Sequence, residues 1–193
     1  MLENYILDTN AYAAIFEMPR TDVYKNLEAK LRVDGVMRFS IPEIVSMEIH
    51  SVIGKFRRGG ATENNMACGR NYFHGEEIKA CSNVCFYPKR TRMNSKIFKG
   101  FQKLINDIEE KNGDIQATLL PLGQAELAYG KNFLQRYAHQ YAFGSHDALI
   151  AGTVAAGIES GVSFTLITSD KGLKALCRAQ NISVFDPRQP GVT

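Results

Sequence analysis

The sequence lacks any hydrophobic run long enough to cross a membrane. A transmembrane helix needs about 20 consecutive apolar residues, and no apolar stretch in the 193 residues approaches that length. The chain begins Met-Leu-Glu-Asn, with neither the basic start nor the cleavable apolar stretch of a signal peptide. We therefore expect a cytoplasmic protein that has no membrane partner.

Cysteine is scarce, and its placement does not suggest a disulfide framework. Cys68, Cys81 and Cys85 fall in one stretch, and Cys177 lies in a helical pattern where we expect a small core residue. A chain without an export signal keeps its thiols reduced, so disulfides are not expected. With His74, the clustered cysteines give the spacing C-x5-H-x6-C-x3-C, which lacks the paired C-x2-C of common zinc sites. We therefore do not expect a structural zinc.

Several catalytic and nucleotide-binding motifs are missing. The chain has no G-x-S-x-G elbow of a serine hydrolase, and neither G-x-G-x-x-G nor a P-loop. A haloacid-dehalogenase-like phosphatase needs a second Asp two residues after the Asp that ends its first strand, but Asn10 stands two residues after Asp8. Internal repeats and domain linkers are missing too, so we expect one domain over residues 1–193.

Apolar runs typical of strands alternate with helical patterns along the chain. The expected strands cover residues 3–8, 36–41, 117–122, 164–168 and 182–185. The expected helices cover residues 11–16, 21–32, 44–57, 94–111, 124–141, 145–159 and 171–179. We expect Ser145 to cap the helix at 145–159. This alternation predicts an α/β fold whose mainly parallel sheet of about five strands is covered by helices on both faces.

Basic residues are concentrated in one part of the chain. Residues 55–103 hold 11 Lys and Arg against 3 Glu, whereas the remainder holds 12 basic and 17 acidic residues. Within this part, residues from about 58 to 95 are polar and contain three cysteines, and we interpret them as an insertion with weak regular structure. Such charge asymmetry indicates a polyanion-binding surface, although a solvated, lysine-rich helix face explains it equally well.

Four acids occupy comparable places in the pattern. Asp8 ends the first strand, Asp170 follows the fourth, Asp147 lies early in a helix, and Glu48 lies on the inward face of another. Ligands of open parallel sheets bind at the carboxyl ends of the strands, so these acids should meet there. Clustered acids repel one another and are costly to desolvate, and a divalent cation would neutralise them. The set favours a metal-dependent phosphoryl-transfer enzyme, although each acid alone could be a turn or helix-start residue.

Four short motifs, in order along the chain, resemble those of the PIN domain, most closely the VapC-type toxins of bacterial and archaeal toxin–antitoxin pairs. The motifs are Leu7-Asp8-Thr9-Asn10, Glu48 in the helix after the second strand, Asp147-Ala148-Leu149-Ile150-Ala151 and Thr168-Ser169-Asp170. The closing strand over 181–187 also resembles the last strand of the family. The resemblance covers residues 1–57 and about 115–187, and it implies a three-layer α/β/α sandwich. Family toxins are typically shorter, and the excess length lies mainly in the insertion.

The resemblance also implies an activity, which is hydrolysis of RNA phosphodiester bonds by an endoribonuclease that needs Mg²⁺ or Mn²⁺. The implied metal ligands are Asp8, Asp147 and Asp170, with Glu48 as a further ligand or as the group that orients a water. The implied supporting residues, which would position the acids or the phosphate, are Thr9, Asn10, Thr168 and Ser169. The implied partners are an RNA substrate, a cognate antitoxin and, as in many family members, a second copy in a homodimer. Glu43 competes with Glu48 for the second position, but it lies at the helix start, where it suits the helix dipole.

The basic insertion offers a grip on RNA. Arg57, Arg58, Arg90 and Arg92 would neutralise phosphates, unless these basic side chains are only solvated or contact an acidic antitoxin. Two alternatives to a ribonuclease stay open at this point. One is a catalytically silent PIN module that binds RNA or protein, and the other is a structure-specific DNA nuclease.

Overall fold

The computed structural model describes residues 4–59, 66–67, 71–74, 77–80, 84–85 and 92–189. The chain divides into two compact units, one formed by residues 1–50 with 102–193 and the other by residues 51–101. The expected single domain with an insertion at about 58–95 stays a prediction. None of the described helices combines the length and the apolar character that a membrane crossing requires.

The first unit alternates strands and helices as the sequence predicts. Its strands are β1 (Asn4–Leu7), β2 (Arg32–Val33), β3 (Val36–Pro42), β8 (Ile115–Leu120), β9 (Phe164–Ile167) and β10 (Ser183–Phe185). Its helices are α1 (Thr9–Ala14), α2 (Asp22–Leu31), α5 (Gln124–Tyr137), α6 (Ser145–Glu159) and α7 (Lys171–Ala179). Two helices, α3 (Glu43–Arg58) and α4 (Ser95–Glu109), run from one unit into the other.

The central sheet is parallel except for one short strand. Along it the order is β10, β9, β1, β3 and β8, and all of these neighbours pair in parallel. The short strand β2 pairs antiparallel with the start of β3 through a turn at Asp34-Gly35, whose φ angles are 51° and 79°. Asp-Gly is a strong signal for a two-residue hairpin of this kind. The prediction of about five parallel strands omitted this hairpin.

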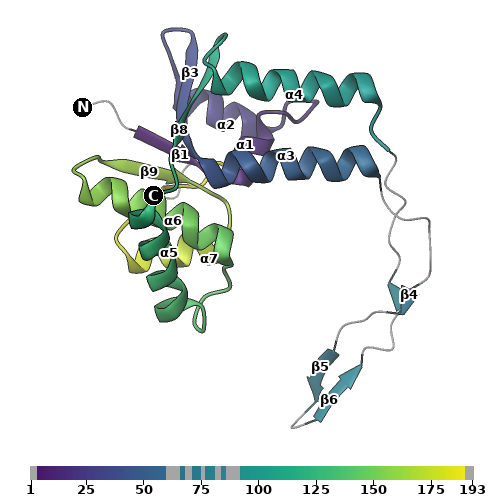
Figure 1. Ribbon diagram of the computed structural model, residues 1–193, viewed down its shortest axis with the longest axis vertical. Coiled ribbons are helices and arrows are strands. Elements are labelled where there is room, and N and C mark those ends of the chain that lie inside the picture. The colour runs from purple at the N-terminus through teal and green to yellow at the C-terminus, as the bar shows by residue number, and fades with distance from the viewer. Residues whose placement is uncertain are drawn as a thin grey trace. The chain divides into compact units, whose positions relative to one another are not determined.

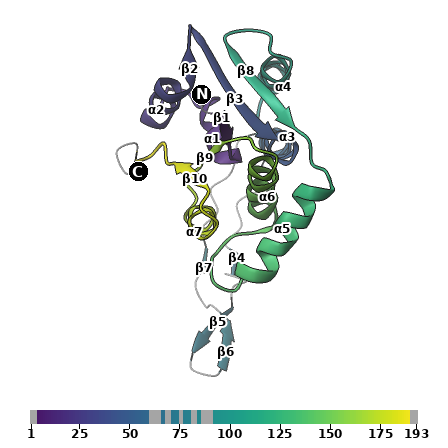
Figure 2. The same cartoon turned by 90° about the vertical axis from the view of Figure 1, so that its left-hand side faces the viewer.

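The direction of the chain along the sheet reverses between β1 and β9. From β1 the chain moves through α1 and α2 to β3, whereas β9 lies on the other side of β1. Right-handed crossovers therefore place α1 and α2 on one face and α5, α6 and α7 on the opposite face, as Figures 1 and 2 show. Ligands of such sheets bind at the point where the direction reverses. The fold therefore directs attention to the ends of β1 and β9.

The core of this unit is built from the central strands and α6. Ile6, Leu7, Leu166 and Ile167 are fully buried. Helix α6 is apolar on nearly all sides because it packs between the sheet and α5, which lies beside it in Figure 2. Cys177 is also fully buried, which confirms the prediction of a small core residue.

The described residues of the second unit form helix ends and two small antiparallel strand pairs. Strand β4 (Met66–Ala67) pairs with β7 (Val84–Cys85), and β5 (Asn71–His74) pairs with β6 (Glu77–Ala80). The Arg57 guanidinium donates to the Met93 carbonyl (3.1 Å) and to Ser95 Oγ (2.7 Å). This side chain therefore helps to hold the start of α4.

Two sequence-based predictions concern this unit. Arg58 and Arg92 are exposed, and Arg90 lies outside the described residues. The RNA-binding role predicted for these arginines and for Arg57 stays a prediction. The positions weighed as zinc ligands also lie outside the described residues, at least in their side chains, so the expectation concerning zinc is not tested.

Gly172 gives a first stability prediction. A Cβ at this buried position in α7 would lie 1.9 Å from the backbone oxygen of Ala142, a residue in the loop before α6. Gly172→Ala should therefore lower the free energy of unfolding by about 1–3 kcal/mol through overpacking. Gly100→Ala is the control, because its Cβ in α4 meets nothing within 4 Å, so it should be neutral or add about 0.5–1 kcal/mol. Urea unfolding measures both variants, and equal stabilities would contradict the close approach.

Candidate metal centre

Asp8 is held in one orientation at the end of β1. It caps α1, and its Oδ1 accepts the Ala11 backbone N–H at 2.7 Å. Its Oδ2 accepts the Thr168 hydroxyl at 2.5 Å. The residue is only 3% exposed, so the carboxylate is fixed in a buried position at the point where the sheet reverses direction.

Asp170 lies just beyond the neighbouring strand, β9. It caps α7 by accepting the Leu173 N–H at 2.7 Å. Its own backbone N–H donates to Thr168 Oγ1 at 3.0 Å. The fully buried Thr168 hydroxyl therefore bonds to Asp8 and to the Asp170 backbone at once.

Asp147 is the third residue of α6. Its Oδ2 accepts the Gly144 N–H at 2.9 Å, and Gly144 is the residue that precedes the helix. The expectation that Ser145 caps this helix is therefore wrong, because Ser145 is already its first residue. The Asp147 carboxylate therefore accepts the Gly144 backbone N–H, a donor at the helix start that has no partner within the helix.

Glu48 reaches the site from α3. Its Oε2 accepts the Thr9 hydroxyl at 2.6 Å, and its Oε1 lies 3.6 Å from His146 Nδ1. The competing acid, Glu43, instead accepts the Leu122 N–H at 3.0 Å beyond the end of β8. Within the described residues, Glu48 is thus the α3 acid that faces the carboxylate site.

The four acids interact electrostatically. Burial raises the pKa of Asp8 from 3.8 to about 6, hydrogen bonds from Thr168 and Ala11 oppose the rise, and the charges of Asp147 and Asp170 add to it. Burial also raises the pKa of Asp147, against the Gly144 hydrogen bond, and the charges of Asp170 and Glu48 contribute. The fold therefore keeps these carboxylates together at an electrostatic cost.

No Lys or Arg offsets that cost through an ion pair with any of the four acids among the residues that the structure describes. The half-exposed His146 lies 3.6 Å from Glu48, and its charge opposes the rise in the pKa of Asp147. A fifth acid, Asp186, behaves differently because it is paired with Lys174. Burial opposes its ionisation, but hydrogen bonds from Lys174 and Ser169 lower its pKa. Asp186 is thus already neutralised, whereas the four-acid cluster is not.

The donor set of this cluster fits a hard divalent cation. Carboxylate oxygens are the ligands that Mg²⁺ prefers, and the ion usually keeps several waters and uses few protein carboxylates. Within the described ranges, no three Asp, Glu, His or Cys side chains lie close enough together to hold a metal ion between them as they stand. The cluster is therefore a set of repelling acids that a hydrated cation would relieve.

The supporting residues proposed from the sequence have different partners. Thr9 bonds to Glu48, and Thr168 bonds to Asp8. Ser169 instead donates to Asp186 at 2.7 Å, and Asn10 is exposed. The sequence-based predictions did not include the contact of His146 with Glu48 or the role of Asp186. The sequence feature that could have indicated this role is the position of Asp186 before a proline, directly after the last strand.

Comparison with known proteins supports the fold. The chain resembles a solved structure described as FitAcB from Neisseria gonorrhoeae, with a TM-score of 0.58 over 95% of this chain and 98% of that one. The fold is PIN-like. This confirms the predicted α/β/α sandwich with a mainly parallel sheet. Sequence identity is 14%, so the likeness concerns the fold alone. No family profile and no curated protein matches the chain.

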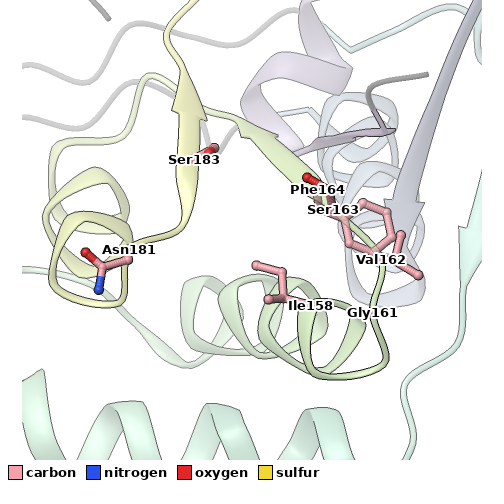
Figure 3. Close-up of a pocket in the computed structure, with 7 residues that line it drawn as sticks. All are labelled: Ile158, Gly161, Val162, Ser163, Phe164, Asn181 and Ser183. Carbon is pink, nitrogen blue, oxygen red and sulfur yellow. The ribbon is translucent and has the colours of Figure 1, made fainter. Parts of the chain in front are cut away.

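One cavity of the molecule lies away from the four acids. Ile158, Val162, Phe164 and Asn181 are among the residues that line a cavity of about 330 Å³, shown in Figure 3. Phe164 begins β9, whereas Asp170 follows the end of that strand. This cavity therefore lies at the amino ends of the strands, where ligands of parallel sheets do not usually bind.

The shared Thr168 hydroxyl gives a second stability prediction. Thr168→Val keeps the shape but removes the donor to Asp8 and the acceptor for Asp170, so the free energy of unfolding should fall by about 1–3 kcal/mol. Thr153→Val is the matched control, since the buried Thr153 hydroxyl donates only to Leu149 of its own helix. Its loss should be under about 1 kcal/mol. Equal losses of unfolding free energy in the two variants, measured in urea, would show that the Thr168 bridge adds no stability beyond that of an ordinary hydroxyl bond within a helix.

Proposed function

We propose that this protein is an endoribonuclease that depends on a divalent cation. The observation that carries the proposal is the cluster of Asp8, Glu48, Asp147 and Asp170, which lies at the reversal point of a PIN-like sheet without a Lys or Arg partner among the described residues. Asp8, Asp147 and Asp170 would hold Mg²⁺ or Mn²⁺, and Glu48 would add a ligand or orient a water.

The residues around the cluster prepare it for this chemistry. Hydrogen bonds to Thr168 and Ala11 fix Asp8, and the cap of α7 fixes Asp170. A cation bound there would polarise the scissile phosphate and lower the pKa of an attacking water. The Thr9 hydroxyl holds one oxygen of Glu48, and the other oxygen, which lies 3.6 Å from His146 Nδ1, would accept a hydrogen bond from that water.

The choice of RNA, and the role of toxin in a toxin–antitoxin pair, are supported by the resemblance of the four motifs to those of VapC-type proteins. Expression in a bacterial host tests the toxin role. Growth should stop when this protein is induced alone and should resume when the product of a neighbouring short reading frame is induced with it. Normal growth at verified expression would remove the toxin role without removing the nuclease.

Cleavage of a mixed RNA and single-stranded DNA panel tests the nuclease itself. The purified protein should cut RNA in Mg²⁺ or Mn²⁺ and should stop cutting in EDTA. Cutting of DNA alone would favour a DNA nuclease. If folded protein without a bound partner cuts neither substrate with any metal, the ribonuclease proposal is wrong, and a silent RNA- or protein-binding module becomes the better account.

A further inference from the structure

A small cavity opens directly beside the acid cluster. It has a volume of about 110 Å³, and its lining includes Asn10 and Ser169. Asn10 follows Asp8 by two residues, and Ser169 immediately precedes Asp170. Sites for drug-sized ligands measure about 300–1,000 Å³, so this cavity has room for a single ring system rather than for a whole nucleotide.

The cavity combines an apolar lining with polar groups of opposite charge. Ala11, Ala14 and Pro187 are buried residues that line it, and Glu17 and Arg188 are exposed ones. Within the described part of the chain, no hydrogen bond or ion pair engages the Arg188 guanidinium. The Glu17 carboxylate accepts one long bond, from Thr21 at 3.3 Å. The N–H donors of the Arg188 guanidinium and the acceptor oxygens of the Glu17 carboxylate are therefore available to a ligand.

The wall that carries Arg188 is anchored from two sides. Asp186 accepts both the Arg188 backbone N–H (3.0 Å) and the Ser169 hydroxyl (2.7 Å), and it pairs with Lys174. The Pro187 carbonyl accepts the Asn26 amide at 2.9 Å. These contacts fix the cavity relative to the loop that carries Asp170, so the cavity is organised before a ligand arrives.

We propose that this cavity binds a nucleobase of the RNA substrate, next to the scissile phosphate, and selects guanine or cytosine. This inference rests on the proposed nuclease function. Guanine and cytosine each carry a carbonyl that can accept from Arg188 and an amino group that can donate to Glu17. Adenine lacks the carbonyl, and uracil offers Glu17 only one ring N–H, which lies between two carbonyl oxygens that repel a carboxylate. A second phosphate is disfavoured because Glu17 and the nearby acid cluster are anionic.

Binding of the four nucleoside 5′-monophosphates to the full-length protein tests the proposal. In calorimetric titrations with Mg²⁺, GMP and CMP should bind about 5- to 100-fold more tightly than AMP and UMP. Arg188→Ala and Glu17→Gln should each reduce this preference to within about twofold. Arg178→Ala is the matched control, because Arg178 is an exposed arginine of α7 outside the cavity, and it should keep the preference. Thermal unfolding checks that the variants are folded.

Two results separate this inference from the nuclease proposal. If the protein cuts RNA but binds all four monophosphates equally, or if Arg188→Ala keeps the preference, the base-binding cavity is wrong and the nuclease stands. If the preference exists and depends on Arg188 and Glu17 but no RNA is cut with any metal, the cavity stands and the nuclease proposal falls.

Discussion

Replacing Asp147 by asparagine is expected to slow RNA cleavage about 1,000-fold. A catalytic metal contributes several kcal/mol to the transition state, and a loss of about 4 kcal/mol corresponds to this factor. The variant should fold, because the Asn carbonyl can still accept the Gly144 N–H that Asp147 accepts. Single-turnover cleavage at saturating Mg²⁺ measures the effect.

Asp114→Asn is the matched control for this experiment. Asp114 is a largely exposed acid just before β8, at the opposite edge of the sheet from the cluster, and it pairs with Arg32. Its replacement should leave the cleavage rate within about twofold, since surface ion pairs contribute little. An Asp147→Asn protein that cleaves as fast as the control would remove Asp147 from the mechanism.

Asp8→Asn is expected to stabilise the metal-free protein while abolishing its response to metal. The folded pKa of Asp8, about 6, lies above its ordinary value of 3.8. The unfolded chain therefore ionises first, and the metal-free protein loses up to about 3 kcal/mol as the pH rises from about 4 to 6. Removing the charge should recover this energy, which corresponds to a rise in Tm of about 6–12 °C at pH 7.5 in EDTA.

Thermal unfolding with and without Mg²⁺ completes this prediction. Mg²⁺ should raise the Tm of the wild type, because a bound cation stabilises the folded state by mass action and relieves the repulsion between the acids. It should have no effect on Asp8→Asn. Two results together would contradict the prediction: a wild-type Tm that does not change with Mg²⁺, and an Asp8→Asn protein that is no more stable than the wild type in EDTA. They would mean that ionising the buried carboxylates does not destabilise the metal-free fold.

Local sequence patterns predicted most of the strands and helices because the two alternate regularly in the first unit. Thr21 was expected to begin the second helix, and its hydroxyl accepts the Tyr24 N–H there at 3.3 Å. The N-cap of α6 was misplaced by one residue because a glycine precedes the helix and the Asp147 side chain, within the helix, accepts the N–H of that glycine. The Asp34-Gly35 hairpin was overlooked although its turn signal is strong. These differences concern single turns, and they leave the order of the sheet unchanged.

The sequence allowed candidate acids to be grouped, but it did not reveal their contacts. Acids that follow the carboxyl ends of parallel strands gather at one edge of the sheet, so Asp8 and Asp170 could be grouped from sequence. The link through Thr168 and the neutralisation of Asp186 by Lys174 depend on side-chain distances between separate elements. No local pattern encodes such distances. The Glu17–Arg188 cavity likewise joins residues that lie far apart in the sequence.

Anomalous scattering from crystals grown with Mn²⁺ would test the central claim most directly. The account predicts a strong anomalous peak within about 2.5 Å of carboxylate oxygens from at least two of Asp8, Asp147 and Asp170, and no peak at that place in Asp8→Asn crystals. Wild-type crystals that bind Mn²⁺ only elsewhere, with the four acids ordered and unliganded, would contradict the assignment of this cluster as the metal centre.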